Sequence, residues 1–503
     1  MKNRFTKNLL RSCCIGFLLP LSTHAQQWVS LDAKGKLKYD YSSRGDRIPD
    51  FSYAGYKGGG VAIPDIPATI TLQPISGDNS AAIQAAIDKV AAMPLKNGFR
   101  GKVLLSPGNY ECQQTIQIQA SGIVLAGSGS GENGTVLQLS GAPHMAVVIK
   151  GKPSYTNNGP SQLVTDAYIP AGAMKLQVQN GQGFRSGDTV RITKPVTPQW
   201  VKFMGMDDLV RDGKPQTWIS GELTTDRIIT AVKGNTLQLD VPLTDSYDAV
   251  YTSPAGTMVE KISTTGELSN CGIMNFRMVS PSQTGTINER HHQAFFIGGI
   301  TDAWATNIQV FNTINSITLT GRRITLDSIA IYHDDKTIGA AKPADISTNG
   351  PQQLVKNCYI KGANVFYIAT GAKVTGPIVI MDCLFEGGGW IQPHQRWATG
   401  LLVDNCKVPG GGIDFMNRGE MGSGHGWSIG WSVAWNSSAT SFLNQQPPGA
   451  MNWMFGCIGA QRKEARPFDK SPLLPEGIYV SHDHPVQPLS LYKQQLLERL
   501  GKK

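Results

Sequence analysis

One sequence pattern recurs along the second half of the chain and limits what the chain can fold into. The segments VKNCYI, IMDCLF and VDNCKV place Cys358, Cys383 and Cys406 at the same position of a repeat. The steps between successive members range from 20 to 37 residues, and further members are centred on Cys271, Ile308, Ser328, Ser437 and Cys457. A period of about 20–25 residues with occasional long excursions is typical of a solenoid with loops inserted between constant strands.

The repeated segments have the character of β-strands. ITLDSIAIY, PIVIMDC and ATGLLVDNC alternate in polarity and are rich in β-branched residues, and they lack a leucine-rich-repeat frame. Coils of two or three such strands, stacked about 4.8 Å apart, form a parallel β-helix, for which right-handed winding is the default. We therefore predict an all-β, right-handed parallel β-helix. The recurring Cys, Ser or Ile should form an interior column, with packing favoured over disulfides or catalysis for the thiols.

The rest of the chain divides around this solenoid. Residues 1–25 have the basic start, short apolar core and THA ending of a signal peptide, followed in 26–151 by a capping helix (SGDNSAAIQAAIDKVAAM) and the first coils. Residues 152–260 break the register with Gly-Asp and Gly-Asn turns, which predicts an inserted β-rich subdomain that walls a substrate groove. Residues 261–465 should hold the main coils and active-site loops. Residues 466–503 should form a tail whose short helix closes or supports the far end.

The entry to the solenoid resembles that of a known group of proteins. GDNSAAIQAAID, GKVLLSPGNY and IVLAGSGS are similar to the first coils of secreted proteins in the pectate-lyase-like β-helix superfamily. The resemblance covers residues 75 to about 140, and the coil register extends it to about 460. It implies the fold but no single reaction, because members include polysaccharide lyases, inverting polygalacturonase-type hydrolases, epimerases, esterases and phage tailspikes.

Charge and the leader together favour an acidic glycan as the partner. The formal charge of the whole chain is +9. The four basic residues of the predicted signal peptide account for part of it, so the mature chain would carry about +5. For an exported protein this balance suits polyuronic acid better than nucleic acid, although a basic surface without function is the alternative. We expect a secreted or periplasmic monomer without a membrane span. No cofactor or metal is predicted, because zinc-site spacings and a clustered Asp run are absent from the sequence; calcium stays possible.

The candidate site comes from the excursions between strands, where a solenoid places its binding face. His394 and Arg396 in PHQRW, and Arg418 and His425 in NRGEMGSGHGW, fall on consecutive coils, about 5 Å apart. β-Elimination from a uronic acid needs a base for the C5 proton and cations that hold the carboxylate. We predict His394 or His425 as the base, with Arg396 and Arg418 neutralising the carboxylate. Further substrate contacts are expected from Trp397, Trp427, His292, Arg322, Arg323, Glu420 and His333.

Several of these residues also have a purely structural interpretation. Trp427, Trp431 and Trp435 share one face of a strand, so all three rings are candidates for the core. His333 next to Asp334 and Asp335 is also consistent with a surface turn.

Two other functions remain open. An inverting polygalacturonase-type hydrolase is suggested by NT at Asn312–Thr313, DD at Asp334–Asp335 and GHG at Gly424–Gly426. The GHG lies about three coils, or roughly 14 Å, beyond the aspartates, whereas inverting carboxylates are about 6.5–9.5 Å apart. Asp404 with Asp414, or Glu420, would be other carboxylates for this role. A noncatalytic glycan-binding β-helix is the second alternative. The preferred prediction is a lyase that cleaves a pectin-like, uronic-acid-containing polysaccharide.

Overall fold

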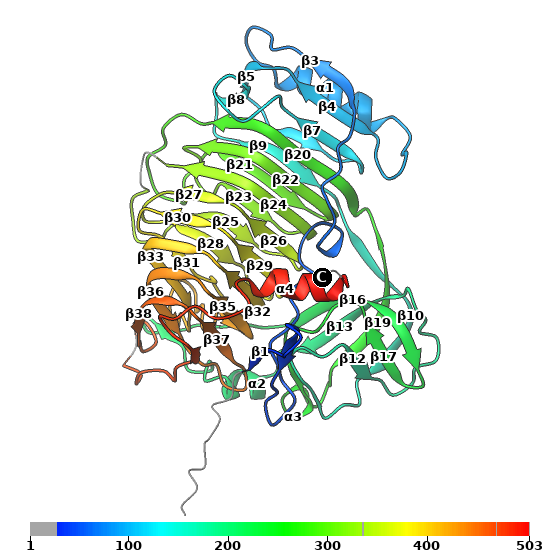
Figure 1. The fold of residues 1–503 in the computed structure, drawn as a ribbon, viewed down its shortest axis with the longest axis vertical. Helices are drawn as coiled ribbons and strands as arrows, with labels where there is room; N and C mark the ends of the chain where they lie inside the picture. The colour runs from blue at the N-terminus through cyan, green and yellow to red at the C-terminus, as the bar shows by residue number, and fades with distance from the viewer. Residues whose placement is uncertain (1–27, 334–336, 469, 502–503) are drawn as a thin grey trace, which may run out of the picture.

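The computed structural model describes residues 28–333, 337–468 and 470–501, so the signal peptide predicted in residues 1–25 lies outside these ranges. Twenty-seven strands join one sheet in which each strand pairs in parallel with strands of the neighbouring coils. The chain thus winds into a right-handed parallel β-helix, as predicted, with the coils stacked along the long axis of Figure 1.

The strands stack in three columns, which surround one hydrophobic core inside the coils. The first column holds β3 (Ala68–Leu72), β4 (Gly101–Leu105), β7 (Ile123–Ala126), β26 (Gln353–Lys356), β29 (Thr375–Met381), β32 (Ala398–Asp404), β34 (Ile429–Gly430), β35 (Ser432–Trp435), β37 (Asn452–Phe455) and β39 (Ile478–Val480). The second column holds β5 (Gly108–Cys112), β8 (Thr135–Leu139), β27 (Tyr359–Lys361) and β30 (Leu384–Glu386). The third column holds β6 (Ile116–Ile118), β9 (Met145–Lys150), β21 (Gln293–Gly298), β23 (Ile317–Leu319), β25 (Ala344–Thr348), β28 (Phe366–Thr370) and β31 (Trp390–Ile391).

Some strands continue from one column into the next. The first and second columns share β20 (Leu268–Val279), β22 (Ile300–Phe311) and β24 (Arg322–Tyr332). The second and third share β33 (Lys407–Phe415), β36 (Ser438–Asn444) and β38 (Ile458–Arg462). The corner between the first two columns has a left-handed residue, for which Asn and Asp are the best tolerated side chains after Gly. This explains the Asn or Asp before each repeated Cys or Ser: Asn357, Asp382, Asn405 and Asn436 all have φ between 45° and 54°.

The predicted interior column is confirmed in its C-terminal part. The amide of Cys358 donates to Cys383 Sγ (3.4 Å) and that of Cys406 donates to Ser437 Oγ (3.1 Å). All six cysteines that the structure describes are buried and free of disulfides. Two assignments were wrong. Ser328 occupies the left-handed corner (φ 58°), and its neighbour Ile329 pairs with Ile308 instead. Cys271 pairs with Ala303 in the first column, where strands of similar composition imitate the same pattern.

Helix α1 (Ser80–Ala91) covers the first coil, as predicted, by burying Ile83, Ile87 and Val90 against β4, β6 and β7. Its N-cap is Asn79, and the neighbouring Asp78 accepts hydrogen bonds from the amide and hydroxyl of Ser80 (2.9 and 2.6 Å). Helix α1 therefore covers the apolar end of the first coil and shields it from water.

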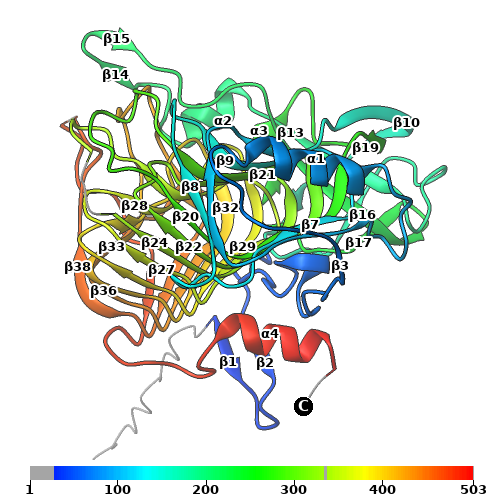
Figure 2. The same cartoon turned by 90° about the horizontal axis from the view of Figure 1, so that it is seen from above.

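The predicted insertion leaves the β-helix after β9 and returns at β20. Its six-stranded antiparallel sheet has the order β10 (Ser154–Leu163), β19 (Met258–Thr265), β13 (Thr189–Pro195), β16 (Glu222–Lys233), β17 (Thr236–Leu239) and β12 (Lys175–Gln177). This inserted sheet lies beside the C-terminal coils in Figure 1. Smaller elements complete the subdomain: β11 (Tyr168–Ile169), β18 (Tyr247–Asp248), α2 (Pro198–Phe203), α3 (Ala249–Thr252), and a β14 (Val210–Arg211) to β15 (Lys214–Pro215) hairpin that projects outward in Figure 2.

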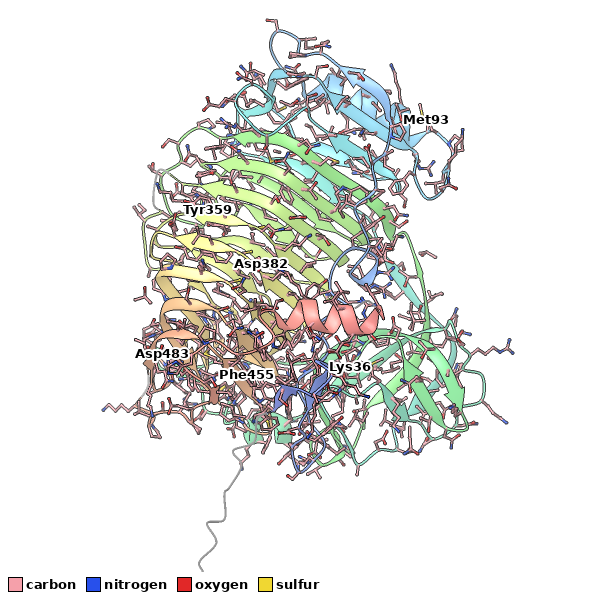
Figure 3. All side chains as sticks on the ribbon, viewed as in Figure 1. Lys36, Met93, Tyr359, Asp382, Phe455 and Asp483 are labelled. Carbon is pink, nitrogen blue, oxygen red and sulfur yellow. The ribbon has the colours of Figure 1, made fainter. Side chains whose placement is uncertain are left out.

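The tail helix α4 (Leu491–Arg499) was predicted to close or to support the far end, and the structure does not place it as a lid over that end. It lies along the flank of the coils, across β32 (Figure 1), together with β1 (Val29–Leu31), β2 (Leu37–Tyr39) and the short helix η1 (Tyr56–Gly58). Gln495 Oε1 accepts the amide of Phe51 (2.8 Å), and Asp382, labelled in Figure 3, pairs with Lys493 (2.7 Å). The first described residues and helix α4 therefore pack on each other, a long-range contact that a local pattern does not reveal.

The carboxylate of Asp404 anchors the start of α4. Its Oδ2 accepts hydrogen bonds from Ser490 Oγ (2.7 Å) and the amide of Tyr492 (2.8 Å). Burial raises the pKa of Asp404 from 3.8 to about 7. The folded protein therefore binds this proton more tightly than the unfolded chain does.

We expect Asp404 to lower the free energy of unfolding as the pH rises from about 4 to about 7. A folded pKa above the unfolded value gives stability that is present below the unfolded pKa and lost as pH rises through the folded one. A shift of this size corresponds to about 4 kcal/mol, and Asp404→Asn should abolish that part of the pH dependence. Urea denaturation at pH 4 and pH 8 measures it. The control is Asp327→Asn, which removes a partly exposed carboxylate of β24 that pairs with Lys356. Equal pH dependence in wild type and Asp404→Asn would contradict the assignment.

Candidate active site

The four predicted catalytic residues lie on two stacked loops that join the third column to the first. His394 and Arg396 follow β31, and Arg418 and His425 lie between β33 and β34. The ring centroids of His394 and His425 are 4.8 Å apart, and the amide of Arg396 donates to the carbonyl of His425 (3.0 Å). The structure thus brings these residues together, as the one-coil spacing required. We call the four residues the Arg418 cluster.

Glycines shape the loop that carries Arg418 and His425. The amide of Arg418 donates to the Gly426 carbonyl (2.8 Å), which closes the loop at its base. Gly422 has a φ of 61°, and a Cβ there would lie 2.2 Å from His425 Nε2. Gly422 is therefore required both by backbone conformation and by the close approach of the imidazole.

Arg418 is a buried cation with unused donors. Its side chain is 5% exposed, and within the described ranges its Nε and Nη1 have no hydrogen-bond partner. Its guanidinium carbon lies 5.3 Å from the centroid of the Phe366 ring. Burial lowers the pKa of Arg418 to about 10, so it stays charged at neutral pH. Buried donors of this kind are costly unless a ligand or water accepts their hydrogen bonds, and a planar guanidinium fits a carboxylate.

Both histidines of the cluster are uncharged at neutral pH. Burial and then the charge of Arg418 lower the pKa of His394 to about 4. Burial lowers the pKa of His425 to about 3, and electrostatic repulsion from His394 and then from Arg418 adds to this effect. A neutral imidazole can accept a proton, and an anion bound to Arg418 would make it a stronger base by cancelling the neighbouring positive charge.

Four residues that the sequence did not single out adjoin the cluster, together with Asp414, which the sequence offered only as a carboxylate for hydrolysis: Lys342, Trp390, Gln392 and Arg462. Lys342 Nζ lies 3.7 Å from the centroid of the Trp390 ring, and burial followed by the charge of Arg418 lowers the pKa of Lys342. Asp414 is 2% exposed and accepts hydrogen bonds from Gln392 Nε2 (2.8 Å) and Arg462 Nη2 (2.5 Å). Burial raises the pKa of Asp414. These side chains lie on or beside third-column strands. The sequence could have indicated three of them, because Trp390, Gln392 and Asp414 alternate with the inward-facing Ile391 and Ile413 of two stacked strands.

The two tryptophans predicted to contact sugar rings are interior residues instead. Trp397 is 3% exposed and its Nε1 donates to Asp245 (3.2 Å); Trp427 is 2% exposed and its Nε1 donates to the Met204 carbonyl (3.1 Å). Both partners belong to the insertion, which covers the rings. The core interpretation is confirmed for Trp431 and Trp435, each 1% exposed.

Glu420 is also held by the insertion. It is 7% exposed, and its Oε1 accepts the amide of Val210 (3.2 Å) in the β14–β15 hairpin. Its backbone carbonyl accepts from Arg211 (3.2 Å). Its role in this structure is therefore to fasten the hairpin to the Arg418 loop, rather than to contact substrate as predicted.

Other predicted contacts lie away from the cluster. His292 packs on His144 (ring centroids 4.9 Å apart) and His333 bonds Asp345 (2.7 Å), both at the start of third-column strands rather than at their ends. Arg323 pairs with Asp302 (2.9 Å) near η1. Asp334 and Asp335 lie outside the described residues. The Asp404–Asp414 pair is separated, because Asp404 lies under α4 and Asp414 on a third-column strand.

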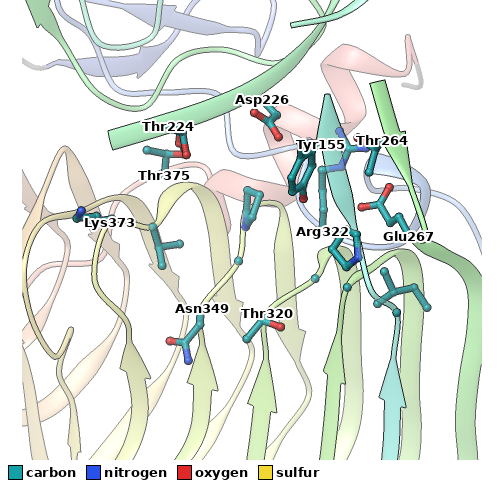
Figure 4. A pocket seen from close by; sticks show the side chains of 18 of the residues that line it. Tyr155, Thr224, Asp226, Thr264, Glu267, Thr320, Arg322, Asn349, Lys373 and Thr375 are labelled. Atoms are coloured by element: carbon teal, nitrogen blue, oxygen red, sulfur yellow. The ribbon is translucent and has the colours of Figure 1, made fainter. Parts of the chain in front are cut away.

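Arg322, the remaining predicted contact, lines a separate groove. This groove of about 650 Å³ lies between the inserted sheet and the loops that follow β9, β21, β23, β25 and β28. Its walls include Tyr155, Asp226, Glu267 and Lys373 (Figure 4). The amide of Lys373 donates to the Arg396 carbonyl (3.0 Å), so the groove ends one coil before the Arg418 cluster.

The described part of the chain offers no evident metal centre and no membrane-spanning helix. It contains no group of three or more His, Cys, Asp or Glu side chains placed to hold a metal ion. None of its helices is both long and apolar enough to cross a membrane.

Comparison with known proteins gives likenesses of fold. No family model and no curated protein matches the sequence. Among solved structures, the tailspike of Pseudomonas phage phi297 covers 81% of this chain and 74% of its own (10% identity, TM-score 0.40). A double mutant of the tailspike of E. coli bacteriophage HK620, in complex with a pentasaccharide, covers 91% and 70% (11% identity, TM-score 0.43). The tailspike of Acinetobacter baumannii bacteriophage AP22, in complex with capsular saccharide, covers 81% and 73% (10% identity, TM-score 0.29).

Proposed function

We propose that this protein cleaves an acidic polysaccharide by β-elimination at a uronic-acid residue, and that the Arg418 cluster is its active site. The observation that carries the proposal is Arg418 itself, a buried guanidinium beside two neutral imidazoles. Two of its nitrogens, Nε and Nη1, have no hydrogen-bond partner among the described residues. β-Elimination from a uronate requires a cation that binds the carboxylate next to an uncharged base that can take the proton.

Each residue of the cluster has its own role in the proposed reaction. Arg418 receives the substrate carboxylate through paired hydrogen bonds, and Lys342 and Arg396 add positive potential around it. Arg396 is fixed by its hydrogen bond to Ser423 Oγ (2.7 Å). With the carboxylate neutralised, a ring nitrogen of His394 or His425 removes the C5 proton. The C5–H electron pair forms the C4–C5 double bond, the C4–O glycosidic bond breaks, and the departing oxygen takes a proton from the imidazolium or from water.

Asp414 supports hydrolysis as a second candidate reaction. Burial raises the pKa of Asp414, which therefore stays protonated to a higher pH than an ordinary carboxylic acid. A protonated carboxyl beside a glycosidic oxygen can act as a general acid. The products distinguish the two reactions, because only β-elimination creates an unsaturated sugar.

The test is to incubate the protein with pectin, alginate, glucuronan and rhamnose-containing uronides. Ultraviolet absorbance of the unsaturated end and reducing ends are measured together. β-Elimination predicts that both signals rise in parallel on one polymer. Reducing ends without absorbance would favour hydrolysis, and neither signal on any of the polymers would contradict the proposal.

Binding of a uronate should be accompanied by proton uptake. The histidines of the free protein have pKa values of about 4 and about 3, and a carboxylate on Arg418 raises both, so protons are taken up on binding at a pH above these values. Affinity for a uronate oligomer should then increase as the pH falls from about 7 towards the free-protein pKa of about 4. Calorimetry in two buffers with different ionisation enthalpies measures the protons. The double variant His394→Gln, His425→Gln should lose the uptake, and its persistence there would contradict the assignment.

A further inference from the structure

The groove beside Arg322 has the construction of a second ligand site. Its volume of about 650 Å³ is in the range of small-ligand sites. One wall comes from the inserted sheet and the other from the corners of successive coils, so the groove follows the stacking direction of the β-helix (Figure 4). The Arg418 cluster contributes no residue to this lining.

The polar groups of the groove suit a polyhydroxylated ligand. Hydroxyl and amide side chains line both walls: Thr224 and Thr264 on the inserted sheet, and Thr320, Asn349 and Thr375 on the coils. Hydroxyls can both donate and accept, as sugar hydroxyls do. Tyr155, 44% exposed, stands over the groove in Figure 4, and the guanidinium of Arg191 lies 4.2 Å from its ring centroid. The negative face of an aromatic ring attracts the polarised C–H groups of a sugar.

The charges of the groove favour acidic sugars. Four cationic side chains and two acidic ones line it. Arg191 and Asp226 neutralise each other through two hydrogen bonds of 2.8 Å. The Nε of Arg322 donates to Thr301 Oγ1 (3.3 Å), whose hydroxyl donates in turn to Glu267 (2.9 Å). No acidic side chain of the described residues forms a direct ion pair with Arg322. With that pair cancelled, three cations (Lys150, Arg322 and Lys373) and one acid (Glu267) remain, so the groove keeps a net positive charge.

We propose that this groove is a second carbohydrate site, which holds a short stretch of an acidic glycan through Arg322 and Tyr155 on its opposite walls. The choice of an acidic glycan rests on the proposed function, whereas binding in the groove requires no cleavage. Because the groove ends one coil before Arg396, a polymer held there stays close to the Arg418 cluster and dissociates more slowly than one bound at the cluster alone.

Calorimetric titration of the full chain tests the inference. The probes are trimers of galacturonate, mannuronate and glucuronate, with maltotriose as the neutral control, and all proteins carry Arg418→Ala to prevent turnover. We expect at least one uronate trimer to bind and maltotriose to bind more weakly. Arg322→Gln should weaken binding by about tenfold or more, and Tyr155→Ala should weaken it by severalfold. Arg185→Gln removes an exposed charge of the same subdomain outside the groove and should leave Kd unchanged.

The outcomes separate this inference from the proposed function. Because the two variants change opposite walls, the misfolding of one variant would still leave the other to test the groove. The melting temperature of each variant should match that of the Arg418→Ala parent. Binding that is unchanged by both Arg322→Gln and Tyr155→Ala, or no binding of any uronate trimer, would overturn the groove as a site. If groove binding is found but the wild-type chain cleaves no uronide, the groove stands and the lyase proposal fails.

Discussion

Arg418→Ala is expected to lower kcat/KM for uronide cleavage by about 10²–10³-fold, because it removes the cation that stabilises the charge developing on the substrate carboxylate. Arg418→Lys should recover only part of the activity, since an ammonium lacks the planar fork that binds a carboxylate through two bonds. Arg185→Ala, an exposed substitution in the insertion, is the matched control. Initial rates of ultraviolet absorbance measure the effect, and full activity of Arg418→Ala would remove this residue from the mechanism.

The stability of Arg418→Ala makes the activity result interpretable. Two nitrogens of Arg418, Nε and Nη1, are buried without partners within the described ranges, so their removal relieves a desolvation cost. That relief offsets the loss of packing between the guanidinium and the Phe366 ring. We therefore expect little change in the free energy of unfolding. A large loss of stability together with lost activity would instead indicate a structural role.

Lys194→Met should cost about 3–5 kcal/mol of folding free energy, because it leaves Asp245 buried without its counter-charge. Lys194 and Asp245 are 4% and 2% exposed, their charged atoms are 2.9 Å apart, and Asp245 also accepts from Trp397. The pair therefore lies where the insertion meets the β-helix. Equilibrium denaturation gives the value directly.

Two further variants sharpen that measurement. Replacing both partners, with Lys194→Met and Asp245→Leu together, should restore much of the loss, since no lone charge remains. Lys261→Met breaks a more exposed pair with Asp188 in the same subdomain and should cost about 0–1 kcal/mol. Equal small losses at Lys194 and Lys261 would contradict the buried-pair account.

The sequence predicted the fold well because a β-helix repeats a local rule. Each corner between the first two columns needs a left-handed residue followed by a small or apolar interior side chain, and Asn357–Cys358 and Asn405–Cys406 satisfy it. The same rule located the Arg418 cluster, since one step of the repeat is one coil in space. It failed at Ser328 and Cys271, where the pattern recurs one residue away or in another column.

The remaining site residues depend on contacts that a repeat cannot encode. Trp397 and Trp427 are covered by residues of the insertion, far earlier in the chain, and Glu420 is fixed by the amide of Val210. Without that long-range contact they look like exposed aromatic and acidic loop residues. Lys342 and Arg462 were missed for the opposite reason, because they lie beside or on strands rather than on the excursions between them.

The docking of the insertion onto the Arg418 loop has a consequence for biosynthesis. Trp200 and Trp218 leave the ribosome well before Trp397, against which both pack in the finished molecule (ring centroids 5.8 and 6.2 Å apart). Until translation reaches the last coils, these indoles lack their partner and stay exposed to water or to chaperones. A chain truncated before residue 397 would keep the stacked N-terminal coils but leave the indole rings of Trp200 and Trp218 without Trp397. We expect such a truncated chain to aggregate through this exposed apolar surface.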